Sequence, residues 1–255
     1  MSTVILIPAR FASTRYPGKP LVELKGAGGT PKPLIQRSHE AAMRVPGVTA
    51  VQGVTHDDGT RCPAEAFGPS LIMTSDACRN GTERCAEALG QLGPVDLVVN
   101  LQGDALLTPP GFVTALVDHM QANPEADVAT PAMRQRSSEV RALQAEEAAG
   151  RVGGTSVVSD NHGRALYFSK KLIPYLPRQA LDSQLSPVRL HIGIYAYRRQ
   201  VLETYVATPV SELEQLEGLE QLRFLAAGIP VELVEVETPP FTLRELNNPE
   251  DVAPI

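Results

Sequence analysis

The sequence contains little that would support a disulfide framework, a zinc site or a membrane span. Its three cysteines are Cys62, Cys78 and Cys85, an odd number without a CxxC pair, which predicts neither disulfides nor zinc. Cys78 and Cys85 could share one helix face, and we expect them to be small core residues. The apolar start of the chain ends after about five residues at Pro8, too short for a signal peptide or a membrane span. We therefore expect a cytoplasmic protein.

The chain also lacks a basic tract. It has 23 Lys and Arg against 29 Asp and Glu, for a formal net charge of −6. This balance argues against a broad surface for nucleic acid or anionic membranes, although it permits a local basic pocket. With 255 residues, 43% of them hydrophobic and 20% charged, the chain can bury a full core as one large α/β domain, with or without an insert.

Short β-branched apolar runs alternate with helical patterns in the first half of the chain. The runs expected to be strands are residues 3–7, 48–54, 70–73, 96–102 and 127–131; the expected helices are residues 33–44, 64–67, 82–92 and 110–122. This alternation predicts an α/β, Rossmann-like, mainly parallel and doubly wound sheet. Ligands of such sheets bind beyond the carboxyl ends of the strands, so residues 8–19 and 102–107 are expected to face one cleft.

The second half has a different pattern. We expect a polar helix within residues 134–151, a hairpin of residues 155–159 and 165–168, and a strand at 190–197. An amphipathic helix at 212–227, with Leu213, Leu216, Leu219 and Leu222 on one side, and a strand at 231–236 follow. These patterns predict a single domain over residues 1–255. Its core comprises about 1–131 and 190–255, with an inserted region at about 132–189.

Three cations lie close together directly after the first strand. Arg10, Arg15 and Lys19 are on a loop that also contains Gly18 and two prolines. Fixed cations and accessible backbone N–H groups are what a nucleoside triphosphate requires. The loop is not a Walker A motif, because GxxxxGK[ST] is absent. The spacing alone is compatible with an anion site and equally with an ordinary solvated loop.

A carboxylate follows the fourth expected strand. Asp104 comes after Gly103 in the segment NLQGD, at the end of a buried run. An aspartate in this place could hold a divalent cation that offsets charge on a triphosphate. The alternative is a turn capped by an aspartate side chain.

Six segments together carry a family resemblance. They are IPARFASTRYPGKPL (7–21), NGTER (80–84), NLQGD (100–104), ALYFSK (165–170), HIGIYAYR (191–198) and LEQLEGLEQLR (213–223). In this order and spacing they resemble the 3-deoxy-manno-octulosonate cytidylyltransferases, or CMP-Kdo synthetases. The resemblance runs from Val4 to about Val252, and the first segment is the most specific of the six.

The resemblance implies an activity and an assembly. Members of this family transfer CMP from CTP to the anomeric hydroxyl of an acidic sugar, here 3-deoxy-manno-octulosonate or a similar acid, and release pyrophosphate. They have a Rossmann-like sheet with a smaller dimerisation subregion, require Mg²⁺ and act as homodimers. We accordingly expect CTP and an acidic small molecule as partners, with no nucleic acid and no membrane.

The resemblance also assigns roles to residues. The nucleotide would be bound by Ala9, Arg10, Ser13, Arg15, Lys19, Gly81 and Thr82. The acceptor would be bound by Gln102, His191, Tyr195, Glu214, Glu220 and Gln221. The metal ligands would be Asp104 and Asn247, and the catalytic residues Arg10, Lys19 and Asp104.

Some positions depart from the family pattern. Ala105 replaces a glutamate beside the expected metal ligand, and Ser156 replaces a lysine on one wall of the acceptor cleft. Asn247 replaces the second metal-binding aspartate; its amide oxygen is an uncharged and weaker ligand. Glu245, two residues earlier, would share its strand face and could supply the missing carboxylate, or could simply be exposed. His56 is expected to be a turn residue.

These departures leave three hypotheses for the reaction. The first is CMP transfer to 3-deoxy-manno-octulosonate or a similar acid. The second is a specialised transferase that acts on a phosphonate or another small acid in secondary metabolism. The third is a nucleotide-binding homologue with weak or no catalysis, which the loss of a metal-binding aspartate would explain.

Overall fold

The computed structural model describes residues 1–9, 16–25, 29–60, 70–102 and 108–239, apart from the side chain of Arg178. The first half of the chain forms one side of the main sheet, in the order β5-β4-β1-β6. These strands are β1 (Thr3–Pro8), β4 (Ala50–Thr55), β5 (Ser70–Met73) and β6 (Leu97–Leu101), and every pairing among them is parallel. The expected α/β, Rossmann-like arrangement is confirmed.

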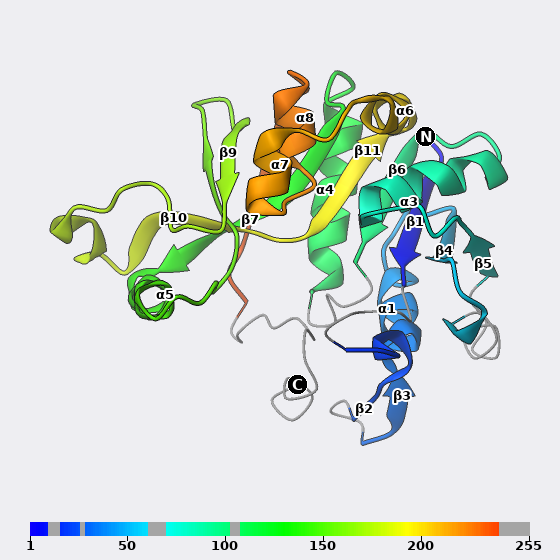
Figure 1. Ribbon diagram of the computed structural model, residues 1–255, viewed down its shortest axis with the longest axis horizontal. Helices are drawn as coiled ribbons and strands as arrows, with labels where there is room; N and C mark the ends of the chain where they lie inside the picture. The colour runs from blue at the N-terminus through cyan, green and yellow to red at the C-terminus, as the bar shows by residue number, and fades with distance from the viewer. Residues whose placement is uncertain (10–15, 26–28, 61–69, 103–107, 240–255) are drawn as a thin grey trace.

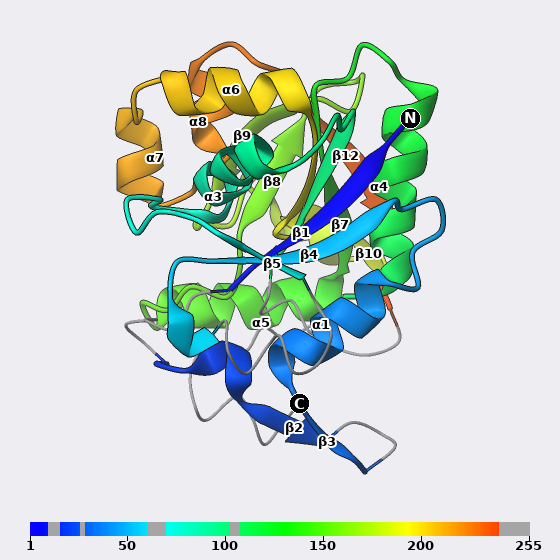
Figure 2. The same ribbon diagram turned by 90° about the vertical axis from the view of Figure 1, so that its right-hand side faces the viewer.

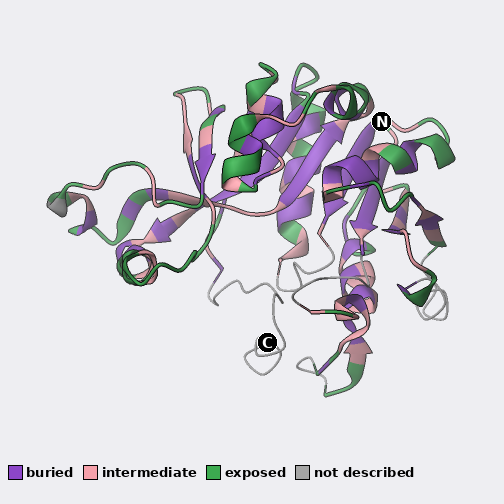
Figure 3. Ribbon diagram, viewed as in Figure 1, coloured by how far each residue is buried: buried purple, intermediate pink, exposed green. Residues whose placement is uncertain are grey.

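Helices cover both faces of this sheet, as a doubly wound fold requires (Figure 2). Ile5 and Ile7 of β1 pack with α1 (Leu34–Ala42) and α4 (Pro110–Ala122) on one face. Val4 and Leu6 pack with α3 (Gly81–Ala88) and α6 (Arg199–Ala207) on the other. The central strands are therefore buried on both sides (Figure 3), which explains their continuous apolar runs.

The second half of the chain extends the sheet mainly with antiparallel strands. Its elements are β7 (Val128–Arg136), α5 (Ser137–Ala148), β8 (Ser156–Ser159), β9 (Ala165–Ser169), β10 (Leu185–His191), β11 (Ile194–Arg198) and β12 (Val231–Val236). The sheet continues β6-β11-β7-β10-β8-β9, and β12 runs parallel to β7. Strands β8 to β10 and helix α5 lie at the end of the molecule away from β5 (Figure 1). The expected boundary after residue 131 falls within β7, and the division into core and insert stays a prediction.

Smaller elements complete the description. The 3₁₀ turns are η1 (Lys19–Leu21), η2 (Leu89–Gln91) and η3 (Arg178–Leu181); β2 (Glu23–Lys25) and β3 (Pro31–Pro33) form a separate antiparallel pair; α7 (Glu212–Glu217) and α8 (Leu222–Ala226) precede β12. Cys78 and Cys85 are buried and free, as expected of core residues. In the described part of the chain, no helix is both long and apolar enough to cross a bilayer. The short helix expected at 64–67 lies outside the described residues.

One expected strand is interrupted. Residues 190–197 were expected to form a single strand, but it breaks at Ile192 and Gly193 into β10 and β11. The register against β7 shifts by two residues across the break, from His191 opposite Ala132 to Ala196 opposite Ala129. The break lets β10 pair with β8 on its outer edge while β11 pairs with β6. Such a bulge redirects side chains and is common beside functional sites.

The expected amphipathic helix at 212–227 is wrong as a single helix. Gly218 has φ 60° and ends α7 in the left-handed conformation that glycine adopts without a steric penalty. Leu213 and Leu216 are 44% and 76% exposed, whereas Leu219 and Leu222 are buried. A strict spacing of three residues drifts around a helix of 3.6 residues per turn, so these leucines could not share one buried face.

Candidate functional site

Two parallel strands end side by side at one edge of the sheet. Ala9 follows β1 and Gln102 follows β6, and the two strands are neighbours. Ala9 is 3% exposed, and its backbone N–H donates to the carbonyl of Val54 at 2.9 Å. Strand β11 begins at the same edge, with Ile194 opposite Leu101. This is the carboxyl edge where the sequence places the cleft.

The predicted triphosphate loop is described only at its end. Lys19 is the first residue of η1, a turn that contacts α1 and buries Pro20. The other members of the loop, Arg10, Ser13 and Arg15, lie outside the described residues. The grouping of the three cations therefore stays a prediction.

Helix α3 presents its first turn to the end of β6. The side chain of Asn80 caps the helix by accepting a hydrogen bond from the Glu83 N–H at 2.8 Å. A Cβ atom on Gly81 would lie only 2.7 Å from Nε2 of Gln102 and 3.1 Å from Nδ2 of Asn100. A larger residue here would have to displace the end of the Gln102 side chain, so the absence of a Cβ lets the helix N-terminus lie directly against the strand end.

The carboxyl of Glu220 joins this junction from the opposite side. It accepts a hydrogen bond from the Thr82 N–H at 3.1 Å, and Nε2 of Gln102 donates to it at 3.4 Å. Burial raises the pKa of Glu220 to about 7, against the opposing effect of its hydrogen bonds with Thr82. The Thr82 hydroxyl also lies 2.7 Å from the hydroxyl of Tyr197. The hydrogen bond from Thr82 to Glu220 thus joins a residue predicted to bind the nucleotide to a residue predicted to bind the acceptor.

Two aromatic residues extend the site toward β10. The ring of His191 contacts that of Tyr195, with centroids 5.3 Å apart, and meets Phe168 edge-on at 5.2 Å. Burial lowers the pKa of His191 to about 3, so its imidazole is neutral at physiological pH. Its Nε2 atom is buried and has no hydrogen-bond partner among the described residues. A neutral imidazole with an open nitrogen can exchange a hydrogen bond with a ligand hydroxyl or carboxylate.

Two buried amides are also left without partners. Asn100 is fully buried, and neither its Oδ1 nor its Nδ2 has a hydrogen-bond partner in the described part of the chain. Gln221 is 2% exposed, and its Nε2 is likewise unpartnered there. Buried polar groups are costly unless they are satisfied, so these amides offer hydrogen bonds to water, to a polar ligand or to groups outside the described residues.

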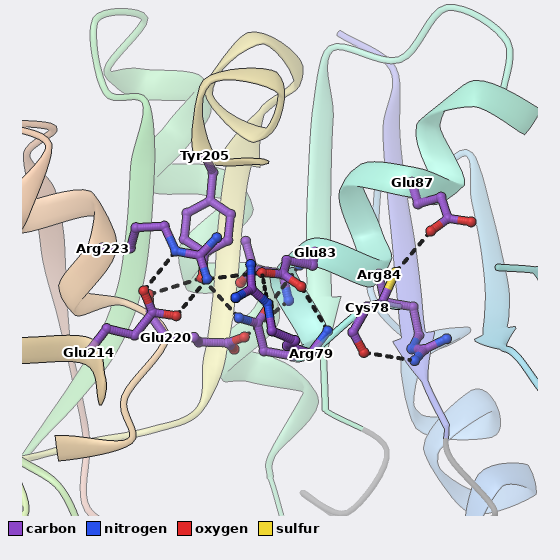
Figure 4. A network of polar contacts seen from close by, with 11 residues as sticks. Cys78, Arg79, Glu83, Arg84, Glu87, Tyr205, Glu214, Glu220 and Arg223 are labelled. Atoms are coloured by element: carbon purple, nitrogen blue, oxygen red, sulfur yellow. Dashed lines mark hydrogen bonds and ion pairs between the residues drawn. The ribbon is translucent and has the colours of Figure 1, made fainter. Parts of the chain in front are cut away.

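A buried arginine binds the helices around the site together (Figure 4). Arg223 is 1% exposed and makes a two-pronged contact with Glu214, with Nε at 2.7 Å and Nη2 at 2.6 Å from its carboxylate oxygens. Its Nη2 also lies 2.9 Å from the Glu83 carboxylate. Glu214, a predicted acceptor residue, is thus engaged by Arg223, and its contact with an acceptor stays a prediction.

The fold therefore gathers most of the described predicted residues at one junction. Gly81, Thr82, Gln102 and Glu220 meet there directly, His191 and Tyr195 line the adjoining strands, and Glu214 and Gln221 flank Glu220 in α7 and the turn after it. Residues that sequence reasoning did not single out are Asn80, Asn100, Tyr197, Tyr205 and Arg223. All of them except Tyr205 lie within the segments that carry the resemblance, and Arg223 gave a second signal, since a cation in an apolar run is buried only when paired.

The position of Ser156 differs from the expectation. Its side chain does not line the wall shared with His191: it lies on the other face of the sheet, near Leu143 of α5. The Ser156 hydroxyl donates to the Lys171 carbonyl at 2.5 Å and accepts from the Ile173 N–H at 3.1 Å. Alternation of side chains explains this, because Ser156 pairs with Leu190, the neighbour of His191. Ser156 therefore has a structural role in this chain.

The predicted metal ligands cannot be placed from the described residues. Asp104, Asn247, Glu245 and Ala105 all lie outside them, and in the ranges that are described no three His, Cys, Asp or Glu side chains form a metal-binding group. His56 follows β4 in a bend, with Nδ1 3.9 Å from the Asp57 carboxylate, in keeping with a turn residue.

Comparisons with known proteins point to one family. A family model described as cytidylyltransferase matches residues 4–235. The 3-deoxy-manno-octulosonate cytidylyltransferase of Maricaulis maris is 38% identical over 98% of this chain and 94% of its own. The 8-amino-3,8-dideoxy-manno-octulosonate cytidylyltransferase of Shewanella baltica (strain OS155) is 36% identical over 99% and 96%. A solved CMP:2-keto-3-deoxy-manno-octonic acid synthetase in complex with CTP superposes with a TM-score of 0.84 at 37% identity, covering 100% of this chain and 96% of that one.

Proposed function

Because the chain belongs to the cytidylyltransferase family and is a CTP-dependent nucleotidyltransferase, we propose that it transfers CMP from CTP to 3-deoxy-manno-octulosonate and releases pyrophosphate. The observation that carries transfer to an acceptor is the junction at the carboxyl edge of β6. There Gln102 and Glu220, predicted to bind the acceptor, lie against Gly81 and Thr82, predicted to bind the nucleotide. The choice of 3-deoxy-manno-octulosonate as that acceptor rests on the relatives named for 3-deoxy-octulosonates.

The arrangement suits a direct displacement. The acceptor hydroxyl attacks the α-phosphorus of CTP, the new P–O bond forms as the bond to pyrophosphate breaks, and the hydroxyl proton is released. Such a reaction needs alignment of the two substrates and stabilisation of charge, and it needs no covalent intermediate. Glu220 and the neutral imidazole of His191 offer hydrogen bonds that would orient a polyhydroxylated acid beside the N-terminus of α3.

We also propose Mg²⁺ as the cofactor, held by Asp104 with Asn247 or Glu245. Carboxylate and amide oxygens are suitable ligands, and the ion would offset negative charge on the phosphates. Gln102, the last described residue after β6, lies at the junction. Asp104 follows it by two residues in the sequence.

The acceptor is tested by pyrophosphate release with CTP, Mg²⁺ and a panel of acids. We expect turnover with 3-deoxy-manno-octulosonate, and its 8-amino-8-deoxy analogue is the matched comparison because it differs at one carbon. Turnover with a phosphonate alone would support the specialised transferase instead. Tight CTP binding by calorimetry without turnover on any acid would support a nucleotide-binding homologue and would contradict the proposed function.

Glu220 should give acceptor use a dependence on pH. Its ionised carboxyl accepts the hydrogen bonds from Thr82 and Gln102, so this is the form that holds the junction together. Because the pKa is about 7, kcat/KM for the acceptor should rise as pH increases through that value. In Glu220→Gln we expect kcat/KM to be about tenfold lower and nearly flat between about pH 6 and about pH 8. An unchanged pH profile in this variant would contradict the assignment.

The same carboxyl should affect stability with the opposite slope. The unfolded chain releases this proton near the ordinary value of 4.5, whereas the folded protein keeps it until about 7. Between these values ionisation costs the folded state free energy, so stability from this group is lost as pH rises. The Tm of wild type relative to Glu220→Gln should therefore fall between about pH 5 and about pH 8. Parallel Tm curves for the two proteins would speak against a raised pKa.

A further inference from the structure

The acceptor side of the site depends on a short turn. Glu220 and Gln221 lie in residues 218–221, between a helix of six residues and one of five. Helices this short are not stable by themselves, because too few hydrogen bonds offset the cost of nucleation. The position of the turn must therefore be fixed by side-chain contacts with the rest of the fold.

Arg223 supplies the main contact. It is the second residue of α8, and its guanidinium reaches Glu214 in α7 and Glu83 in α3 at the same time. Glu214 precedes the turn 218–221 and Arg223 follows it, so their ion pair fixes both ends of the turn. The second carboxylate belongs to the helix whose first residues, Gly81 and Thr82, meet Glu220. One side chain therefore connects the acceptor turn with the nucleotide helix (Figure 4).

Tyr205 reinforces this connection from α6. The guanidinium of Arg223 stacks on the ring of Tyr205, with its Cζ 4.1 Å from the ring centroid. Its hydroxyl donates to the backbone carbonyl of Glu220 at 3.1 Å and accepts from Nδ2 of Asn80, the capping residue of α3, at 3.1 Å. The tyrosine therefore fixes the backbone of Glu220 against the same helix end that the arginine fixes through Glu83.

Stability alone does not account for a charge at this place. A buried ion cluster loses hydration, and apolar residues of similar volume are often as stabilising. The neighbours Leu222 and Phe224 are fully buried in the core, so an apolar side chain would fit the composition of the surroundings. What the ion cluster adds is geometry: the planar fork binds two carboxylates in fixed directions.

We propose that Arg223 is a positioning residue for CMP transfer, which holds the acceptor turn 218–221 in register with the first turn of α3. The proposal rests on the function proposed above, because the turn matters only if it binds the acceptor. A displacement of about 1 Å in such a site lowers the rate about 100-fold. The arginine contacts Glu214 and Glu83 and acts on the site through the position of Glu220.

Two variants and one control test the proposal. Arg223→Lys keeps the charge but cannot bind both carboxylates as a fork, and Tyr205→Phe keeps the ring but loses the hydroxyl. Glu232→Gln is the control: it weakens the half-buried pair of His119 and Glu232 between α4 and β12. We expect kcat/KM for the acceptor to fall about 10- to 100-fold in Arg223→Lys and about tenfold in Tyr205→Phe. KM for CTP should stay within about twofold of wild type, and the control should keep both constants.

Amide hydrogen exchange provides a readout that does not depend on turnover. In Arg223→Lys the Thr82 N–H, which donates to Glu220, should exchange about tenfold faster, while amides of β6 stay protected. Wild-type kinetics and unchanged Thr82 exchange in the two folded variants, with only a lower Tm, would overturn the positioning role. A different outcome would be faster Thr82 exchange in Arg223→Lys while the wild-type protein turns over none of the acids. That result would reject the proposed function but would retain the structural link between the turn and α3.

Discussion

Asp104→Ala should lower kcat by about 1000-fold or more, which is the largest single effect we expect in this protein. Negative charge builds on pyrophosphate as it leaves, and a cation held by Asp104 would offset that charge. Without the carboxylate such a cation would be bound weakly, while the remaining residues would still align the substrates. The measurement is pyrophosphate release at saturating CTP and acceptor over a range of Mg²⁺ concentrations.

Asp118→Ala is the matched control, because Asp118 lies exposed on α4. Circular dichroism should show both variants folded, and CTP binding without Mg²⁺ should be the same in both. Near wild-type turnover in Asp104→Ala at low Mg²⁺ would remove Asp104 from the metal site. If high Mg²⁺ fully restored the activity of Asp104→Ala, Asp104 would be a metal ligand that contributes to Mg²⁺ affinity alone.

Lys19→Met should reduce kcat/KM for CTP about 10- to 100-fold. A hydrogen bond to a charged group contributes about 1.5 to 3 kcal/mol, and methionine removes the charge while it keeps the apolar stem. Lys19 begins the turn η1, which packs against α1. The effect should appear in the constants for CTP, with little change in KM for the acceptor.

The control for this variant is Lys25→Met, an exposed lysine of β2 close in sequence. Lys19→Arg should recover part of the activity, because it restores the charge with a different shape. If Lys19→Met and Lys25→Met had the same kinetics, Lys19 would not contact the triphosphate, and the solvated-loop interpretation would hold for this end of the segment.

Much of the fold could be predicted from local pattern. Residues 3–7, 70–73 and 231–236 form strands as expected, and the strand expected at 96–102 spans 97–101. The helix at 110–122 was predicted with the bounds of α4. These segments have their periodicity and stop signals within a few residues, so no distant contact was needed to recognise them. The Rossmann-like class follows from their alternation.

The breaks in the second half could not be predicted in the same way. The interruption at Gly193 exists because β10 and β11 take different outer partners, β8 and β6, a choice that involves strands far apart in the chain. The break at Gly218 is visible as a glycine, but a glycine inside a helical pattern is often tolerated. Only the burial of Leu219 and Leu222 against the core shows that two short helices replace one.

The sequence by itself determined the family, the order of the main strands and helices, and the residues expected around the two substrates, because motifs and periodicity are local properties. The tertiary structure alone decided which of those residues meet. Thr82 and Glu220 are separated by 138 positions, and so are brought together only by packing of α3 against the turn 218–221. It also decided the roles of Ser156 and Arg223, since the face on which a side chain lies and the partner that neutralises its charge are set by neighbours remote in sequence.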